Sequence, residues 1–160
     1  MADITPAHTQ TITHNYIVHY PAHYPRVGDP HYIDFEHYHK LHAATAKCAY
    51  ADSADADQCT TDKPLELHHK IIEFSLQNGV DFAVLEKDFP GISNPNEVGA
   101  WVESDQNFEW LCVWHHRSAG GVHTASASDF EAERYVKDLI SRVGSSSPSR
   151  GVVVKGGHDE

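Results

Sequence analysis

The chain has 160 residues, the size of one domain with tails, and 40% of them are hydrophobic, which is enough for a modest core. Its 12 Lys and Arg residues are outnumbered by 23 Asp and Glu residues, so the formal net charge is −11 at pH 7. This balance excludes a protein that coats nucleic acid indiscriminately, because such proteins depend on neutralising phosphate charge. Any contact with nucleic acid must be local, with bound cations supplying part of the positive charge.

The sequence carries no membrane or export signal that we recognise. No apolar run is long enough to span a membrane, and residues 1–5 lack the basic start and apolar stretch of a signal peptide. We therefore expect a cytoplasmic protein. An odd number of cysteines, three, in a reducing compartment favours metal ligation or buried thiols over disulfides. The chain also has 14 histidines, and histidine is the commonest metal ligand.

The N-terminal part divides into an arm and a helix. Residues 1–28 are rich in His, Tyr, Pro and Thr without a helical period, which predicts an extended arm. This arm either docks on DNA or a partner, or wraps on the domain through its tyrosines. Asp29-Pro30 then predicts a helix start, since an acidic N-cap followed by proline suits a helix N-terminus. The helix is expected to end near Lys47.

Two short strands are predicted on either side of a helical insertion. Leu65–His69 alternates apolar and polar residues, and Asn107–Trp114 is the second strand candidate. Between them, helical segments are predicted to begin at Ile71, after an N-cap at Asp81, and at Asn94-Pro95.

The C-terminal part combines one predicted helix with a tail. Ser128 and Glu131 have the spacing of a capping box, which predicts a helix from Ser128 to about Arg142. Residues 144–160 are rich in Ser, Gly and Pro, a composition that predicts a disordered tail.

Histidine pairs accompany both predicted strands. His68 and His69 end the first, and His115 and His116 follow the second. Neighbours on a strand point to opposite faces, but at a strand end both side chains can approach one place. Runs that deliver imidazoles to one place are typical of a divalent metal site. A polar strand end without chemistry is the alternative for the first pair taken alone.

The two motifs together, LELHH at residues 65–69 and NFEWLCVWHH at residues 107–116, resemble the HNH, or ββα-metal, nuclease family. That family has a His at the end of its first strand, an Asn in the hairpin and a His that opens the helix. A common form of its second motif is Asn-x-x-x-Leu-Cys-x-x-Cys-His, from which this chain differs at one ligand position. With GGVH at residues 120–123, the pattern is similar to small HNH proteins of bacteriophages.

The resemblance implies both a fold and an activity. The fold would be α+β, with a ββα-metal core, a helical insertion and flanking helices, in a nuclease domain of residues 29–143. The activity would be metal-dependent hydrolysis of DNA phosphodiester bonds by an endonuclease. The catalytic ion would be Mg²⁺, Mn²⁺, Ni²⁺ or Zn²⁺, and imidazole ligands favour a transition ion.

The resemblance also assigns roles to individual residues. His69 matches the general base, and Asn107 matches the residue that braces the hairpin and helps to orient that base. His68 and His116 match metal ligands. His123 is a further candidate, either as a ligand or as a phosphate contact.

Arg117 follows His116 directly and is the best candidate for a phosphate contact, with a solvated arginine as the alternative. Two imidazoles with open coordination positions would suit phosphodiester cleavage, because a divalent ion can bind phosphate and water together. A neutral imidazole near its ordinary pKa suits the role of base for water.

The cysteines gain a role from the same resemblance, because many HNH proteins hold a structural zinc ion between two ligand pairs. Here Cys48 and Cys59 precede the first strand, and Cys112 and His115 fall on the second pair. They would form a tetrahedral Cys₃His zinc site, and His115 and His116 would then face different metal ions. Ten residues separate the first pair where the family has two, so this loop must fold back. Three buried thiols are the alternative.

Other functions are compatible with the same features. A catalytically inactive, zinc-stabilised module of the same fold could bind a protein partner, and the net charge of −11 favours this. The joint presence of His69, Asn107 and His116 favours the enzyme. A third possibility is an accessory to phage DNA packaging that acts alongside a terminase. The expected partners are therefore DNA or a phage protein, in a bacterial host cell.

Overall fold

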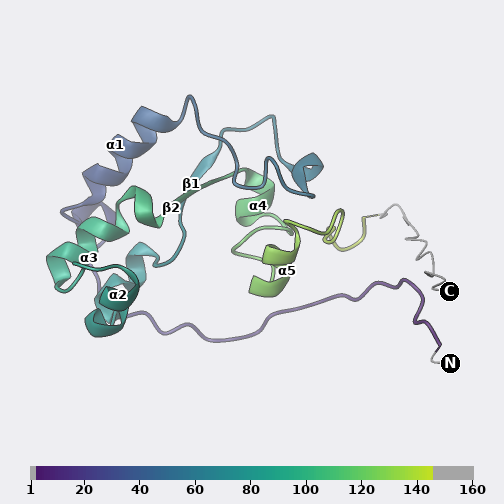
Figure 1. Ribbon diagram of the computed structural model, residues 1–160, viewed down its shortest axis with the longest axis horizontal. Helices are drawn as coiled ribbons and strands as arrows, with labels where there is room; N and C mark the ends of the chain where they lie inside the picture. The colour runs from purple at the N-terminus through teal and green to yellow at the C-terminus, as the bar shows by residue number, and fades with distance from the viewer. Residues whose placement is uncertain (1–2, 146–160) are drawn as a thin grey trace, which may run out of the picture.

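The computed structural model describes residues 3–145, so most of the predicted tail lies outside the described residues. The fold is a small mixture of helices and strands with a two-stranded antiparallel sheet. In Figure 1, α1, α2 and α3 lie on one side of the two strands, and α4 and α5 lie on the other. The helices are α1 (Tyr32–His42), α2 (Phe82–Asp88), α3 (Pro95–Val102), α4 (Val113–Arg117) and α5 (Ala127–Ala132), the strands are β1 (Glu66–His69) and β2 (Phe108–Leu111), and the 3-10 helices are η1 (Arg26–Gly28), η2 (Ala56–Gln58), η3 (Phe74–Gly79) and η4 (Asp105–Asn107). Within residues 3–145, none of the helices combines the length and the apolar character needed to cross a membrane.

The hairpin presents two chemically different faces. β1 pairs with β2 so that His68 lies opposite Glu109 and His69 lies opposite Phe108. Because side chains alternate along a strand, the two consecutive histidines leave opposite faces of the sheet. One face carries Glu66, His68, Glu109 and Leu111, and the other carries Leu67, His69, Phe108 and Trp110.

The sheet lies between two hydrophobic clusters. Leu111 and Cys112 pack with Cys48, Tyr50 and Phe130 on the side of α4 and α5. The second cluster lies in the insertion between the strands and includes Trp101. Its buried members are Phe74, Leu85, Val98, Trp101 and Val102.

Local capping explains why the insertion is helical. The side chain of Asp81 accepts a hydrogen bond from Val84 N, and that of Asn94 accepts one from Glu97 N, so both predicted starts are confirmed. The predicted start of a helix at Ile71 is wrong. The N–H groups of Ile71 and Ile72 donate to Asn107 Oδ1 instead, and the observed 3-10 helix η3 begins later.

The first helix is shorter than predicted. Asp29 accepts hydrogen bonds from His31 N and from Gln77 Nε2, so it closes a turn that precedes α1 and ties that turn to η3. The helix therefore begins after Pro30 and ends at His42. It contacts the sheet through Phe35 and Tyr38, whose rings pack on Phe108, and none of its residues is fully buried.

The capping box predicted at Ser128 is wrong. Ser126 is the N-cap of α5, and its Oγ accepts a hydrogen bond from Asp129 N. The helix ends at Ala132 rather than near Arg142, because the carbonyl of Arg134 accepts a hydrogen bond from Ala54 N in the cysteine loop.

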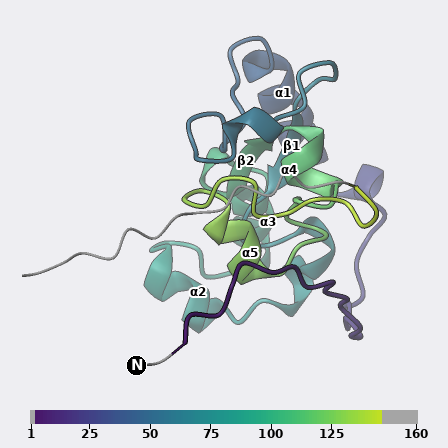
Figure 2. The ribbon, with the colours of Figure 1, turned by 90° about the vertical axis from the view of Figure 1, so that its right-hand side faces the viewer.

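The arm contacts the domain through its prolines and backbone. Residues 3–25 contain no helix or strand. Asn78 Nδ2 donates to the carbonyl of Ala22, and Pro21 packs on Gly79. Residues 12–14 and 16 of the arm line one cavity of about 960 Å³ together with α5, and Figure 2 shows the arm passing α5. The expected wrapping through tyrosines is wrong, because the tyrosines of the arm are exposed: Tyr16, Tyr20 and Tyr24.

The position of the α5 cap can be tested by mutation. Ser126→Ala should lower the free energy of unfolding by about 1 kcal/mol, because it leaves the Asp129 N–H without its acceptor. Ser128→Ala is the matched control and should change it by less than about 0.5 kcal/mol, as surface substitutions usually do. Urea denaturation of both variants measures this, and equal effects would contradict the assignment.

Candidate metal centre and active site

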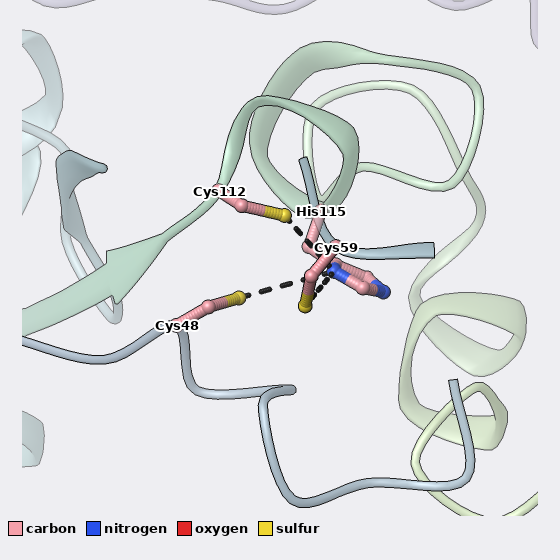
Figure 3. Close-up of side chains that lie close together, drawn as sticks. All are labelled: Cys48, Cys59, Cys112 and His115. Atoms are coloured by element: carbon pink, nitrogen blue, oxygen red, sulfur yellow. Dashed lines mark hydrogen bonds between the residues drawn. The ribbon is translucent and has the colours of Figure 1, made fainter. Parts of the chain in front are cut away.

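The structure brings Cys48, Cys59, Cys112 and His115 together at one point (Figure 3). The three sulfur atoms lie 3.8, 3.6 and 3.2 Å from His115 Nδ1, in chain order. The four potential ligand atoms all lie within 4.8 Å of one another. This grouping is the one that the resemblance implies.

Two local structures create the cluster. Cys112 is the N-cap of α4 and His115 lies one turn later, so their side chains meet on one side of the helix. The long loop between Cys48 and Cys59 folds back through tight turns. In it, Tyr50 N donates to Cys48 Sγ, and Cys59 N donates to the carbonyl of Ala56.

The imidazole of His115 is oriented by contacts on two sides. Its Nε2 lies 2.8 Å from Asp55 Oδ2, and both groups are buried. A carboxylate accepts hydrogen bonds, so Nε2 carries a proton and Nδ1 is the ring atom directed at the three sulfur atoms. Tyr50 stacks on the ring with a centroid distance of 4.5 Å. Asp55 was not predicted, because it is one of several acidic residues in a polar loop.

The chemistry of the donors fits a metal ion such as zinc. Three sulfur atoms and one imidazole are a known ligand set for tetrahedral zinc. The hydrogen bond with Cys48 lowers the pKa of Cys112, and the same contact raises the pKa of Cys48. A thiolate at the centre of the cluster is the form that binds a metal ion. The residues present could therefore hold zinc in a closed, structural site.

A buried carboxyl group lies beyond His115. Glu133 is fully buried, and together with Asp55 and His115 it forms a compact cluster. Burial, and then the charge of Asp55, raise the pKa of Glu133 to about 8. This shift favours the neutral form of the carboxyl group, which lowers the negative charge beside the cysteine cluster.

A second group of imidazoles lies on the other side of α4. His68 comes from β1, His116 from α4 and His123 from the loop that follows α4. The Nε2 atoms of His116 and His123 are 3.1 Å apart, and one nitrogen from each ring lies within 4.8 Å of the others. All three predicted ligands therefore meet at one place, and adjacent His115 and His116 face different clusters.

Backbone contacts place His123 in this group. His123 N donates to the carbonyl of His116, and Val122 N donates to that of His115, so the loop returns along α4. A Cβ on Gly121 would lie 2.6 Å from the carbonyl carbon and oxygen of His116. Only glycine fits this close approach of the backbone.

The surroundings of His68 and His116 favour the neutral form of both rings. Burial, followed by the charges of His123 and His116, lowers the pKa of His68 to about 3. Burial also lowers the pKa of His116. A neutral imidazole has a lone pair for a metal ion. His116 Nδ1 lies 3.5 Å from Glu66 Oε1, which leaves its Nε2 directed into the group.

Arg117 does not point freely into the site. Its Nε lies 3.0 Å from Glu66 Oε1, and its side chain is 61% exposed. The guanidinium is therefore accessible from solvent at the edge of the imidazole group, where it shares Glu66 with His116.

His69 occupies the opposite face of β1 but borders the same pocket. Its Nε2 lies 3.0 Å from Glu103 Oε2, and its ring packs against Phe35 and Phe108, which also contact each other. A pocket of about 340 Å³ is lined by His69 and by all three imidazoles of the second group. Glu103 was missed in the sequence, because a lone acidic residue after a helix carries no signal in an acidic chain.

Asn107 braces the hairpin, as its position in the motif predicts. Its side chain is fully buried, and Oδ1 accepts hydrogen bonds from Ile71 N and Ile72 N. Nδ2 donates to the carbonyls of Ile72 and Val102. The amide thus shapes the turn after β1, whereas the ring of His69 donates its hydrogen bond to Glu103 and has none with Asn107.

Comparison with known proteins identifies no relative: no family model, curated protein or solved structure matches the chain.

The close approach at Gly121 predicts that Gly121→Ala disturbs the return of the chain along α4. It should destabilise the protein by about 1–3 kcal/mol, because the new methyl group meets backbone atoms that cannot move independently. Gly28→Ala is the control, since its Cβ would approach other atoms no closer than 3.9 Å. Thermal unfolding of both proteins measures the difference, and an unaffected Gly121→Ala variant would contradict the geometry.

The Cys₃His cluster predicts a metal-dependent fold. Removal of zinc by a chelator should abolish the cooperative thermal transition, because ligand assembly and folding are linked. Substitution of Co²⁺ should produce thiolate charge-transfer absorption, which Cys112→Ser weakens and His68→Ala leaves unchanged. His68→Ala is the control because it removes an imidazole of the other group. A chelated protein that unfolds cooperatively at an unchanged temperature would rule out the structural role.

Proposed function

We propose that this protein is a metal-dependent endonuclease of the HNH type that hydrolyses DNA phosphodiester bonds, with β1, β2 and α4 as its ββα-metal core. The observation that carries the proposal is the pocket that joins three imidazoles to His69. One pocket thus offers metal ligands and a separate base, which are the two elements that metal-assisted hydrolysis requires.

His68, His116 and His123 are the residues that would hold the catalytic ion. Their nitrogen donors favour a transition ion over Mg²⁺, although substrate oxygens can alter this preference. His123 is exposed, so the site is open to a phosphate group from solvent. When bound, a divalent ion would neutralise charge on the phosphate and on the leaving oxygen.

His69 is the proposed general base. It accepts a proton from a water molecule as the water oxygen forms a bond to phosphorus. The phosphorus–oxygen bond to the leaving sugar then breaks, and the leaving oxygen takes a proton from solvent. The products are a phosphate monoester and a sugar hydroxyl, and His69 returns its proton to solvent. The packing of Phe35 and Phe108 holds the ring at the pocket wall throughout.

The proposed structural zinc and the proposed active site share α4. His115 would anchor the helix to the cysteine loop, and His116 is the next residue in the chain. Metal binding at the closed site would therefore support the position of a ligand at the open one.

The charge of the chain favours a second candidate, a zinc-stabilised module that binds a protein partner. The net charge is −11, and two arginines beside the pocket, Arg26 and Arg117, form ion pairs with Glu103 and Glu66. If the protein is instead an enzyme, it would bind a DNA duplex through the metal ion and a few local contacts. Alternatively, a complex with a partner protein such as a phage terminase would bind the duplex.

A plasmid-nicking assay tests the enzyme. The full chain is incubated with supercoiled DNA and Mg²⁺, Mn²⁺, Ni²⁺ or Zn²⁺, and nicking is expected with at least one of them. His69→Ala should lose about 10²-fold or more in rate, because general-base catalysis contributes at least this much. His37→Ala is the matched control, since His37 is an exposed histidine of α1 outside the pocket.

The outcomes separate the two candidates. A folded, zinc-containing protein that nicks DNA with none of these ions supports the binding module. Nicking that His69→Ala retains at the wild-type rate removes the proposed base.

A further inference from the structure

We infer that Glu103 is a positioning residue that holds His69 in the tautomer with the proton on Nε2, leaving Nδ1 as the basic atom. This inference rests on the proposed function, in which His69 accepts the proton of water. It assigns a role to a residue that neither the motifs nor the resemblance identifies.

The contacts of Glu103 define what it can do to the ring. Glu103 follows α3, and its side chain is fully buried. Oε2 lies 3.0 Å from His69 Nε2, while Arg26 NH2 lies 3.2 Å from Oε1 and 3.3 Å from Oε2. A carboxylate paired with a guanidinium can only accept hydrogen bonds, so His69 Nε2 must be the donor.

The other ring nitrogen is left available. Among residues 3–145, no group forms a hydrogen bond with His69 Nδ1. The ring centroid lies 5.4 Å from that of Phe35 and 5.7 Å from that of Phe108. These two rings also contact each other, with centroids 5.4 Å apart, so they form one aromatic surface against which the His69 ring packs. A ring flip would break the hydrogen bond to Glu103. The geometry therefore selects Nδ1 as the atom that faces a water molecule in the pocket.

Arg26 holds the carboxylate in turn. Its guanidinium carbon lies 4.5 Å from the ring centroid of Phe35 and 5.2 Å from those of Tyr32 and Phe74. These cation–π contacts fix a cation that also borders the pocket. Arg26 belongs to η1, where the N-terminal arm joins the domain, so the arm contributes to the site through this residue.

The arrangement has a chemical consequence beyond orientation. When His69 accepts a proton it becomes a cation, and a buried carboxylate hydrogen-bonded to its other nitrogen stabilises that charge. The carboxylate and the histidine have the same two roles in catalytic triads, where an acid holds the tautomer of a histidine without itself taking the proton. Because Arg26 compensates Glu103 before the reaction, the carboxylate can remain buried in the resting protein.

The test compares Glu103→Gln and Glu103→Asp with the wild-type full chain. In the wild type, Oε2 contacts both Arg26 and His69, while Oε1 lies 3.2 Å from Arg26 NH2. In Glu103→Gln, Arg26 should draw the amide oxygen to the Oε1 position, so the amide nitrogen would take the Oε2 position and donate to His69 Nε2. The ring should then switch to the tautomer with the proton on Nδ1. Glu103→Asp retains a carboxylate and should retain the wild-type tautomer. Glu86→Gln, an exposed position on α2, is the control.

The tautomer is measured directly from ring nitrogen shifts of the histidine-labelled protein, with His69 assigned as the signal missing from His69→Ala. We expect a protonated Nε2 in the wild type, a protonated Nδ1 in Glu103→Gln, and no change in Glu86→Gln. With DNA, Glu103→Gln should lose about 10- to 100-fold in kcat with KM changed less than about threefold, as is usual for groups that support a reacting residue.

The outcomes are separable from those of the proposed function. A wild-type His69 protonated on Nδ1, or a Glu103→Gln variant with an unchanged tautomer or unchanged kcat, overturns the inference. If the wild type nicks no DNA, the nuclease proposal fails while the tautomer switch still establishes the positioning contact. If Glu103→Gln does not fold, the inference is tested by comparing the wild type with Glu103→Asp. The same His69 tautomer in both proteins supports the positioning role, and a different tautomer in Glu103→Asp contradicts it.

Discussion

The two contacts of the His115 ring are the constraint on which the candidate site depends. Nδ1 faces three sulfur atoms and Nε2 bonds Asp55, so the ring ties α4 to the cysteine loop in two directions. The next residue, His116, therefore has a fixed position opposite His68. The chain after α4 then returns along the helix through Gly121 and places His123 beside them.

The alternation of side chains in the hairpin divides the remaining roles. His68 leaves the face that meets α4, whereas His69 leaves the face that meets α1 and the end of α3. Both border one pocket because they lie at the end of the strand. The insertion between the strands contributes Glu103, which bonds the ring of His69, and Asn107, which braces the base of the hairpin. The insertion is therefore part of the site.

Much of the fold could be predicted where the signal was local. Asp81 and Asn94 cap their helices through their own side chains, and both strands lie where they were predicted. The second strand ends at Leu111 rather than at Trp114, because α4 begins at Val113. The predicted helix bounds were wrong where a residue distant in sequence forms a hydrogen bond with a backbone group that the helix would need. Asn107 captures the N–H groups that a helix at Ile71 would need, and the cysteine loop binds the carbonyl of Arg134 just after α5.

The sequence by itself identified the residues that gather in the two clusters. The spacing of Cys112, His115 and His116 at one short helix is a local property. The motifs named most members of the two clusters, and the resemblance added Cys48 and Cys59. Only the tertiary structure decided which acids orient them. Asp55 and Glu103 act across 60 and 34 positions of the chain, and both are ordinary acidic residues in an acidic sequence. Their roles depend on burial and on a partner brought close by folding, and neither property is encoded in local spacing.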